Sequence, residues 1–511
     1  MAGYKQNTKL MAKNSAYLYV QMAVRMIIGL YTVRVILHAL GAEDYGIYNV
    51  VAGFVTMFTF VTSTLVSASQ RFFAYALGRG EHELLNRYFN VSLLCYIILS
   101  IILFVVIEAF GWWFVNYKMV IPPERLYAAN WVLQISIVAF IIRILAVPSS
   151  AMLVANEKMI VYAFVHVLDA FLLLGIAFLL QVVTSDRLIV YAWCMLGISL
   201  VSSIIFIGMC RSSYNEASRI RLRWDVGLLK ELLSYCGWYM FGTMATVVRE
   251  QGLNILLNVF FNPIVNAARA IAYQINNAIN QFVNSFYQAV RPQITKLTAA
   301  EENEKMLSLV SSSSVISFLL MCLVSIPMLV EMPFVLSVWL HDYPEYTVIF
   351  ARLVIITAMI DTLGMPLTTA VCSLGRIRNY QVITGSILIL NLPVSYVLLR
   401  LCATPYIVFY VSIVLSCVTQ VVRVLFMKKM FRMSILRYTR EVIFRTFLIS
   451  IVSFTATYFL SQAVANDFWS HLIVIMLSIL FIVLLSFYGG FTRVQREAMV
   501  AMARKKLNRH K

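Results

Sequence analysis

Residues 267–290 form an apolar segment that carries many amides. Plotted at 100° per residue, its polar side chains fall within an arc of roughly 120°: Arg269, Asn276, Asn277, Asn280, Asn284, Gln288 and Arg291. A polar stripe along a whole helix does not face lipid. It either joins helices through hydrogen bonds in a dry bundle or borders a water-filled cleft. One or two amides suffice for the first role, so the length of the stripe favours the cleft.

Arginines also occur inside apolar segments. Arg25 lies in the middle of residues 15–40, on the same face as Gln21. A central arginine costs about 2.5–3.5 kcal/mol on membrane-insertion scales, so we expect it to have a partner or a function. We favour a cavity-lining role over structural pairing for Arg25. Arg143 is either a further cation of the cleft or one half of a buried pair, and Arg249 points either towards a neighbouring helix or towards the edge of the cleft.

Residues 47–77 show a weaker polar face that includes Ser63. Small hydroxyl residues also allow helices to pack closely, so this face alone favours neither a cavity nor packing. The acidic candidates for ion coupling are Asp361, Asp169 and Glu250. His166 precedes Asp169 by three residues on the same helical face, which indicates either a protonation switch or, more commonly, a hydrogen-bonded structural pair.

The elements that position these residues are fourteen apolar segments, each long enough to cross a bilayer as a helix. They are residues 15–40, 47–77, 87–115, 125–153, 159–183, 187–210, 229–260, 267–290, 306–330, 346–372, 379–400, 406–427, 443–463 and 470–489. With 61% hydrophobic residues and a mean hydropathy of +0.83, the 511-residue chain is too apolar for a soluble protein. The sequence therefore predicts an all-α, polytopic membrane protein.

The loops between these segments alternate between basic and nearly uncharged. Basic loops stay in the cytoplasm, so the pattern places both termini there. The net charge of +18 is explained by this topology, and we expect it to attract anionic lipids rather than nucleic acid. No G-x-x-x-x-G-K-[ST] motif occurs. We expect no cofactor and no metal ion.

The chain shows signs of an internal repeat. Pro148, Lys158 and Tyr162 each have a counterpart 218 residues later, in Pro366, Arg376 and Tyr380. We predict a six-helix lobe at 1–210, a basic cytoplasmic linker at 211–228, and a second six-helix lobe at 229–427. Residues 428–511 add two helices and a basic cytoplasmic tail. Repeats of this kind usually hold the substrate between them near the membrane midplane, here in a central cavity.

Several short segments resemble the bacterial polysaccharide-export proteins. They are NILLNVFFNP at 254–263, VNAARAIAYQ at 265–274, RVILHALG at 34–41, DYGIY at 44–48, RPQI at 291–294 and PLTTA at 366–370. These proteins are Wzx-type oligosaccharide or O-antigen flippases of the multidrug/oligosaccharidyl-lipid/polysaccharide exporter superfamily. The resemblance covers about the whole chain, and its motifs are structural turns rather than catalytic signatures.

The resemblance implies two six-helix lobes around a central, often cationic cavity, and alternating access by rocking of the lobes. It implies a bacterial inner-membrane protein that flips undecaprenyl-pyrophosphate-linked oligosaccharide repeat units for lipopolysaccharide or other surface polysaccharides. The implied partners are that lipid, membrane lipids and other polysaccharide assembly proteins. The residues suit this task, because arginine binds pyrophosphate through paired donors and amides match sugar hydroxyls.

Two other functions compete with flipping. A cation-coupled exporter of small drugs has the same fold, but cationic drugs favour an acidic cavity and arginines outnumber carboxylates within these segments. A membrane enzyme such as a polymerase needs a catalytic cluster, and only the loop 331–345 with His341 and Asp342 offers one. One His-Asp neighbour pair is a weak signal, so we expect no enzymatic activity.

Overall fold

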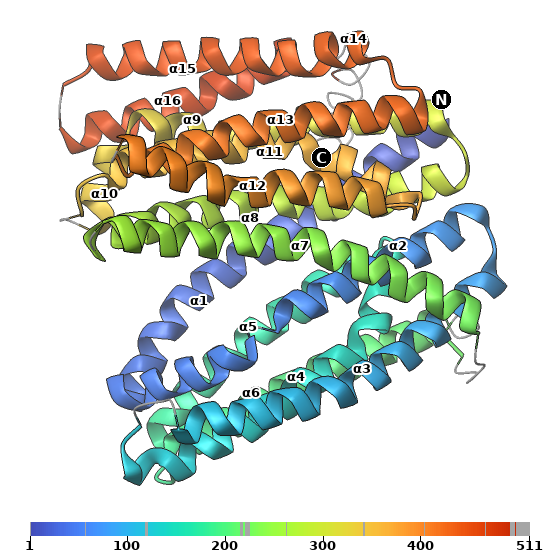
Figure 1. Cartoon of the computed structure of the whole chain (residues 1–511), viewed down its shortest axis with the longest axis vertical. Helices are drawn as coiled ribbons and strands as arrows, with labels where there is room; N and C mark the ends of the chain where they lie inside the picture. Colours follow the sequence, from blue (N-terminus) through green and yellow to red (C-terminus); the bar gives the residue numbers. More distant parts are fainter. Residues whose placement is uncertain are drawn as a thin grey trace, which may run out of the picture. The chain divides into compact units, whose positions relative to one another are not determined.

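The computed structural model describes residues 2–490 except 57, 118–120, 215–217, 220–224, 262, 341–342, 403 and 466, and it also describes residue 496. Over these residues it is made of helices and turns, with no strand (Figure 1). This confirms the predicted all-α fold. The long helices are α1 (Ala2–Thr56), α2 (Thr59–Arg79), α3 (His82–Tyr117), α4 (Leu126–Ala155), α5 (Met159–Val182), α6 (Arg187–Ser213), α7 (Val226–Phe260), α8 (Pro263–Ala299), α9 (Asn303–Val330), α11 (Thr347–Ser373), α12 (Arg378–Cys402), α13 (Ile407–Phe431), α15 (Arg445–Ala463) and α16 (Phe468–Leu485). The short helices are η1 (Pro123–Arg125), α10 (Met332–Leu340) and α14 (Ile435–Tyr438), with π-helical turns η2 (Thr439–Phe444) and η3 (Ser486–Gly490).

All fourteen predicted segments fall on helices. Within the described part of the chain, ten helices are long and apolar enough to cross a membrane, which supports a multi-pass membrane protein. Helices α2, α7 and α8 are not among these ten, because the polar residues noted above lower their mean hydropathy.

The first two predicted segments have different boundaries in the structure. Helix α1 continues past residue 40 and changes direction at Gly41, whose backbone (φ 80°, ψ 165°) is not helical. This conformation favours glycine because it has no Cβ. The predicted segment 47–77 is divided between the end of α1 and α2.

The chain forms two compact units, which we call unit 2 (Ala12–Met240) and unit 1 (Met1–Met11 with Phe241–Lys511). Along the chain, the boundaries between the units fall within α1, between Met11 and Ala12, and within α7, between Met240 and Phe241. The predicted domain limits at 210, 228 and 427 remain predictions. In both units the long helices lie side by side (Figure 1).

The two units share one packing plan. In unit 2, α4 is central and packs against α2, α3, α5 and α6, while α2 also packs on α3 and α5 on α6. In unit 1, α11 takes the central place against α8, α9 and α13, while α8 packs on α9 and α12 on α13. Helices α15 and α16 pack against α9. The correspondence of α4 with α11 agrees with the repeat that the sequence indicates.

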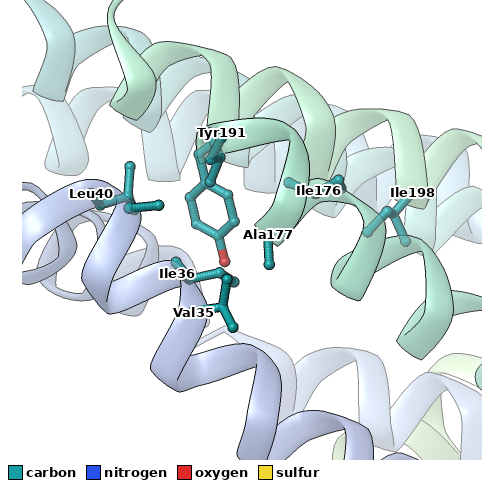
Figure 2. Close-up of a cluster of buried hydrophobic side chains, with 9 residues drawn as sticks. Val35, Ile36, Leu40, Ile176, Ala177, Tyr191 and Ile198 are labelled. Atoms are coloured by element: carbon teal, nitrogen blue, oxygen red, sulfur yellow. The ribbon is translucent and has the colours of Figure 1, made fainter. Parts of the chain in front are cut away.

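The first helix of each half packs differently. In unit 2, Val35, Ile36 and Leu40 of α1 form a core with Ile176 of α5 and Tyr191 of α6 (Figure 2). In unit 1, α7 approaches α12 through glycines. A Cβ added at Gly252 would lie 2.5 Å from the Leu392 side chain, and one at Gly242 would lie 2.0 Å from that of Gln381. Small residues of this kind allow close helix contacts in membranes.

Charged residues fix several helix ends in unit 2. Asp186 caps α6 by accepting hydrogen bonds from the Leu188 and Ile189 amides, and it also pairs with Arg125 at 2.9 Å. Asp225 precedes α7 and accepts from the Leu228 amide at 3.1 Å. That backbone bond and the ion pair with Arg87 lower the pKa of Asp225 below its ordinary value.

Candidate functional site

Helix α8 has an apolar face and a polar face. The residues that pack inside unit 1 include Ala272, Ile275, Ile279 and Val283, all of which are buried. The opposite face carries an amide at every turn, formed by Gln274, Asn277, Gln281, Asn284 and Gln288. We call these five residues the amide ladder. The first four are exposed and Gln288 is partly exposed.

The ladder is continuous and uncharged. Its members are three or four residues apart, the spacing that keeps side chains on one helical face. From Gln274 to Gln288 it extends about 21 Å at 1.5 Å per residue. Among the described residues, no hydrogen-bond partner holds the side chains of Gln274, Asn277, Gln281 or Asn284. Their donors and acceptors are therefore available to water or to a ligand.

The predicted stripe overlaps the ladder but is rotated from it by about 60° at 100° per residue. Asn277, Asn284 and Gln288 belong to both, whereas Gln274 and Gln281 were missed. The predicted stripe also included Arg269, Asn276, Asn280 and Arg291, which lie towards the buried flank of α8, and none of these four is fully exposed. The signal for the two missed glutamines was their spacing of three and four residues from Asn277.

Arg269 joins α8 to α7. It is buried, and it donates to the Glu250 carbonyl oxygen at 2.7 Å and to Asn254 Oδ1 at 3.3 Å. Its guanidinium also lies over the Tyr273 ring, 4.3 Å from the centroid. These contacts hold two nitrogens of the buried guanidinium, while its Nε has no hydrogen-bond partner among the described residues. A substrate-binding role for Arg269 remains a prediction.

Asn276 and Asn280 lie beside the ladder and are partly buried. In the described residues, the buried Oδ1 of Asn276 has no hydrogen-bond partner. On α7, Arg249 and Glu250 are adjacent and partly buried, and no described residue forms an ion pair with either side chain. Asn276, Asn280, Arg249 and Glu250 therefore remain candidates.

In unit 2, Arg143 of α4 is exposed and donates from Nε to Ser199 Oγ of α6 at 3.0 Å. The Ser199 hydroxyl in turn donates to the Met195 carbonyl oxygen at 3.0 Å. Within the described residues, no carboxylate pairs with Arg143. The serine positions the guanidinium without neutralising its charge.

Three further predicted residues lie on α1 and α2. Gln21 is buried and Arg25 is exposed, although both lie on α1. No described residue provides Arg25 with a counter-ion. Ser63 of α2 is exposed, but its hydroxyl donates to the Phe60 carbonyl oxygen of its own helix at 2.8 Å.

The acidic candidates differ in their surroundings. Asp169 of α5 accepts a hydrogen bond from Ser202 of α6, and its Oδ2 lies 3.6 Å from Nδ1 of His166. The expected proximity of His166 and Asp169 is therefore present. Asp361 of α11 lies 3.6 Å from the Arg423 guanidinium of α13 and accepts from Ser416 at 3.4 Å. The prediction missed Arg423, although an arginine within the predicted span 406–427 is itself a signal.

The predicted residues are divided between the units. Unit 2 contains Gln21, Arg25, Ser63, Arg143 and Asp169, and unit 1 contains Arg249, Glu250, Arg269, Asp361 and the amides of α8. Unit 2 thus offers the exposed cations Arg25 and Arg143, whereas unit 1 offers the amides of α8, the paired Asp361 and the adjacent, partly buried Arg249 and Glu250.

Comparison with known proteins identifies the architecture. No family model and no curated protein matches the chain. An outward-facing multidrug resistance MATE family transporter of the MOP superfamily matches with a TM-score of 0.72, 14% identity, and coverage of 83% of this chain and 96% of that one. A MATE protein in complex with MaD3S matches with a TM-score of 0.71, 14% identity, and coverage of 84% and 97%. The chain has the fold of MATE family transporters.

Another structure with the MATE fold is a MOP superfamily transporter from Pyrococcus furiosus. It matches with a TM-score of 0.70, 14% identity, and coverage of 83% of this chain and 96% of that one. Its binding pocket is described as having reverse polarity, which suggests a different function for that protein. At such low identity the similarity shows the fold alone.

Proposed function

We propose that this chain flips an undecaprenyl-pyrophosphate-linked oligosaccharide across the cytoplasmic membrane. The observation that carries the proposal is the amide ladder on α8, which is exposed, uncharged and about 21 Å long at 1.5 Å per residue. Carboxamides both donate and accept hydrogen bonds, so a row of them matches the hydroxyl groups of a sugar chain. A drug-sized apolar cation lacks the hydroxyl groups needed to form hydrogen bonds with five amides in a row.

The exposed arginines support an anionic head group. Arg25 and Arg143 are both exposed in unit 2 and have no counter-ion among the described residues. Guanidinium groups bind phosphate oxygens through parallel hydrogen bonds, and this binding is stronger where water is excluded. The polyprenyl tail would remain in the bilayer while the head group and sugars cross.

This function implies a bacterial inner-membrane protein with both termini in the cytoplasm. The oligosaccharide would be a repeat unit for lipopolysaccharide O-antigen or another surface polysaccharide. The chain would therefore work beside enzymes that assemble and polymerise these units, without being an enzyme itself.

The test is reconstitution into liposomes with a fluorescent undecaprenyl-pyrophosphate oligosaccharide. The measurement is the fraction of label reached by an impermeant quencher over time. We expect the full chain to transfer label between leaflets, and Arg25→Ala to lose most of this activity while it still folds. Arg400→Ala removes an exposed arginine at the end of α12 and is the matched control. Activity in Arg25→Ala equal to that of the control would exclude the role of Arg25.

The second candidate is a small-molecule exporter, which the MATE structural neighbours favour. It predicts transport of fluorescent cationic drugs by the same liposomes and no transfer of the lipid-linked sugar. Drug transport driven by a proton or sodium gradient, together with an inactive lipid assay for several glycans, would replace the flippase proposal.

A further inference from the structure

The pair of Asp361 and Arg423 lies near the middle of two helices of unit 1. Asp361 is the fifteenth of 27 residues in α11, and Arg423 is the seventeenth of 25 in α13. Their side chains are 30% and 17% exposed, so both charged groups are largely buried. A lone carboxylate at this depth is a typical binding site for a coupling cation.

The guanidinium occupies the space beside that carboxylate. Its NH1 atom lies 3.6 Å from Asp361 Oδ1, while Ser416 Oγ lies 3.4 Å from Oδ2. The Tyr380 hydroxyl interacts with the same arginine and also lies 2.7 Å from Thr368 Oγ1. The guanidinium thus meets the Asp361 carboxylate and the Tyr380 hydroxyl, and the Ser416 hydroxyl contacts the same carboxylate. Carboxylate and hydroxyl oxygens are the hard donors that bind small cations.

The backbone of α11 makes room for this arginine. A Cβ added at Gly364 would lie 2.1 Å from Arg423 NH1 and 2.7 Å from its Cζ. No real Cβ approaches another atom so closely, so only glycine permits the present position of the guanidinium. Gly364 is one helical turn after Asp361, and it places the arginine against the acid.

We propose that Arg423 is a tethered cation that permanently fills a cation site formed by Asp361 and Ser416. An arginine remains charged at every accessible pH, and it cannot dissociate from the chain. Asp361 would therefore not exchange sodium ions or protons during transport, and the energy for transport would not enter through this pair. This inference does not depend on which substrate is carried.

The test measures the melting temperature of the purified full chain at pH 8 in NaCl, LiCl, KCl and choline chloride of equal ionic strength. We expect the wild-type melting temperature to be the same in all four salts. Arg423→Met should expose the cation site, so its melting temperature should be lowest in choline and rise by several degrees in NaCl or LiCl, because a ligand that binds only the folded state stabilises it.

The double variant Arg423→Met/Asp361→Asn is the control. It removes both charges, so the salt response gained in Arg423→Met should disappear. An Arg423→Met protein that folds and melts at one temperature in all four salts would overturn the proposal.

A second measurement decides the question even where Arg423→Met does not fold. A wild-type chain whose melting temperature rises in NaCl, with that rise lost in Asp361→Asn, would show that Asp361 already binds an exchangeable cation. That result would refute the tethered cation, and it would leave the proposed flipping of lipid-linked sugars unaffected.

Discussion

The centres of the two units have the same position in the fold and opposite charges. Arg143 of α4 and Asp361 of α11 are 218 residues apart, the same offset as Pro148 and Pro366. Each lies on the central helix of its unit, and each contacts a serine of the neighbouring helix: Ser199 of α6 for Arg143, and Ser416 of α13 for Asp361. The packing plan is therefore shared while the chemistry is not.

The two centres differ in whether the charged residue on the central helix has a counter-ion. In unit 1, Arg423 supplies the counter-charge to Asp361. In unit 2, the described part of α6 has arginines only near its ends, at Arg187 and Arg211, and Arg143 has no acidic partner there. We therefore expect unit 2 to bind the anionic pyrophosphate and unit 1, with its neutral ladder, to bind the sugars.

The largest expected effect is on stability, and it separates the two centres. Asp361→Asn leaves the partly buried Arg423 without its partner and should lower the free energy of unfolding by about 3 kcal/mol. Arg143→Met removes one exposed hydrogen bond to Ser199 and should cost less than about 1 kcal/mol. Thermal unfolding of the purified variants in detergent measures both. Equal losses would mean that Arg143 has a structural counter-charge after all.

The next effect is on transport, where we expect the cation of unit 2 to matter more than the ion pair of unit 1. Arg143→Ala removes a charge-assisted contact of about 1.5–3 kcal/mol, so flipping should slow by about 10- to 100-fold. Arg143→Lys keeps the charge but not the paired geometry and should restore activity only in part. The liposome quenching assay measures the rates. A fully active Arg143→Ala variant would show that the cation of unit 2 does not meet the substrate.

A smaller effect is expected from the ladder. Gln281→Leu removes one amide from an exposed row, and a single hydrogen bond of about 0.5–1.5 kcal/mol corresponds to about a 2- to 10-fold loss of flipping rate. Gln462→Leu, an exposed glutamine near the end of α15, is the control and should have no effect. Transport of a small cationic dye that falls equally in Gln281→Leu would favour the drug exporter.

The fold could be predicted from the sequence because span length and loop charge are strong, local signals. All fourteen segments became helices, including α8, in spite of its amides. The kink at Gly41 and the division of the second segment were not predicted, because a hydropathy window does not register backbone conformation. The shared roles of α4 and α11 follow from the repeat that the offset of 218 residues indicates.

The candidate site was predicted only in part. A helical wheel identifies a polar face, but it cannot separate Arg269, which bonds to α7, from Gln281, which is exposed. Likewise, Asp361 was noticed as an acid, whereas its partner Arg423 is 62 positions further along the chain. Pairing between residues that are distant in the sequence depends on tertiary packing, and it cannot be deduced from a single sequence.

The smallest expected effect tests whether Gly364 is needed to place the Arg423 guanidinium beside Asp361 in unit 1. Gly364 corresponds at the same offset to Ala146 of α4, where no arginine needs the space. Gly364→Ala should displace the guanidinium from Asp361 and lower stability by about 1–2 kcal/mol, although alanine is the better helix former. Gly208→Ala in α6, where no atom lies within 4 Å of an added Cβ, should leave the melting temperature unchanged or raise it slightly. Equal behaviour of the two alanine variants would show that Gly364 is not needed to seat Arg423, and that the two centres differ by the arginine alone.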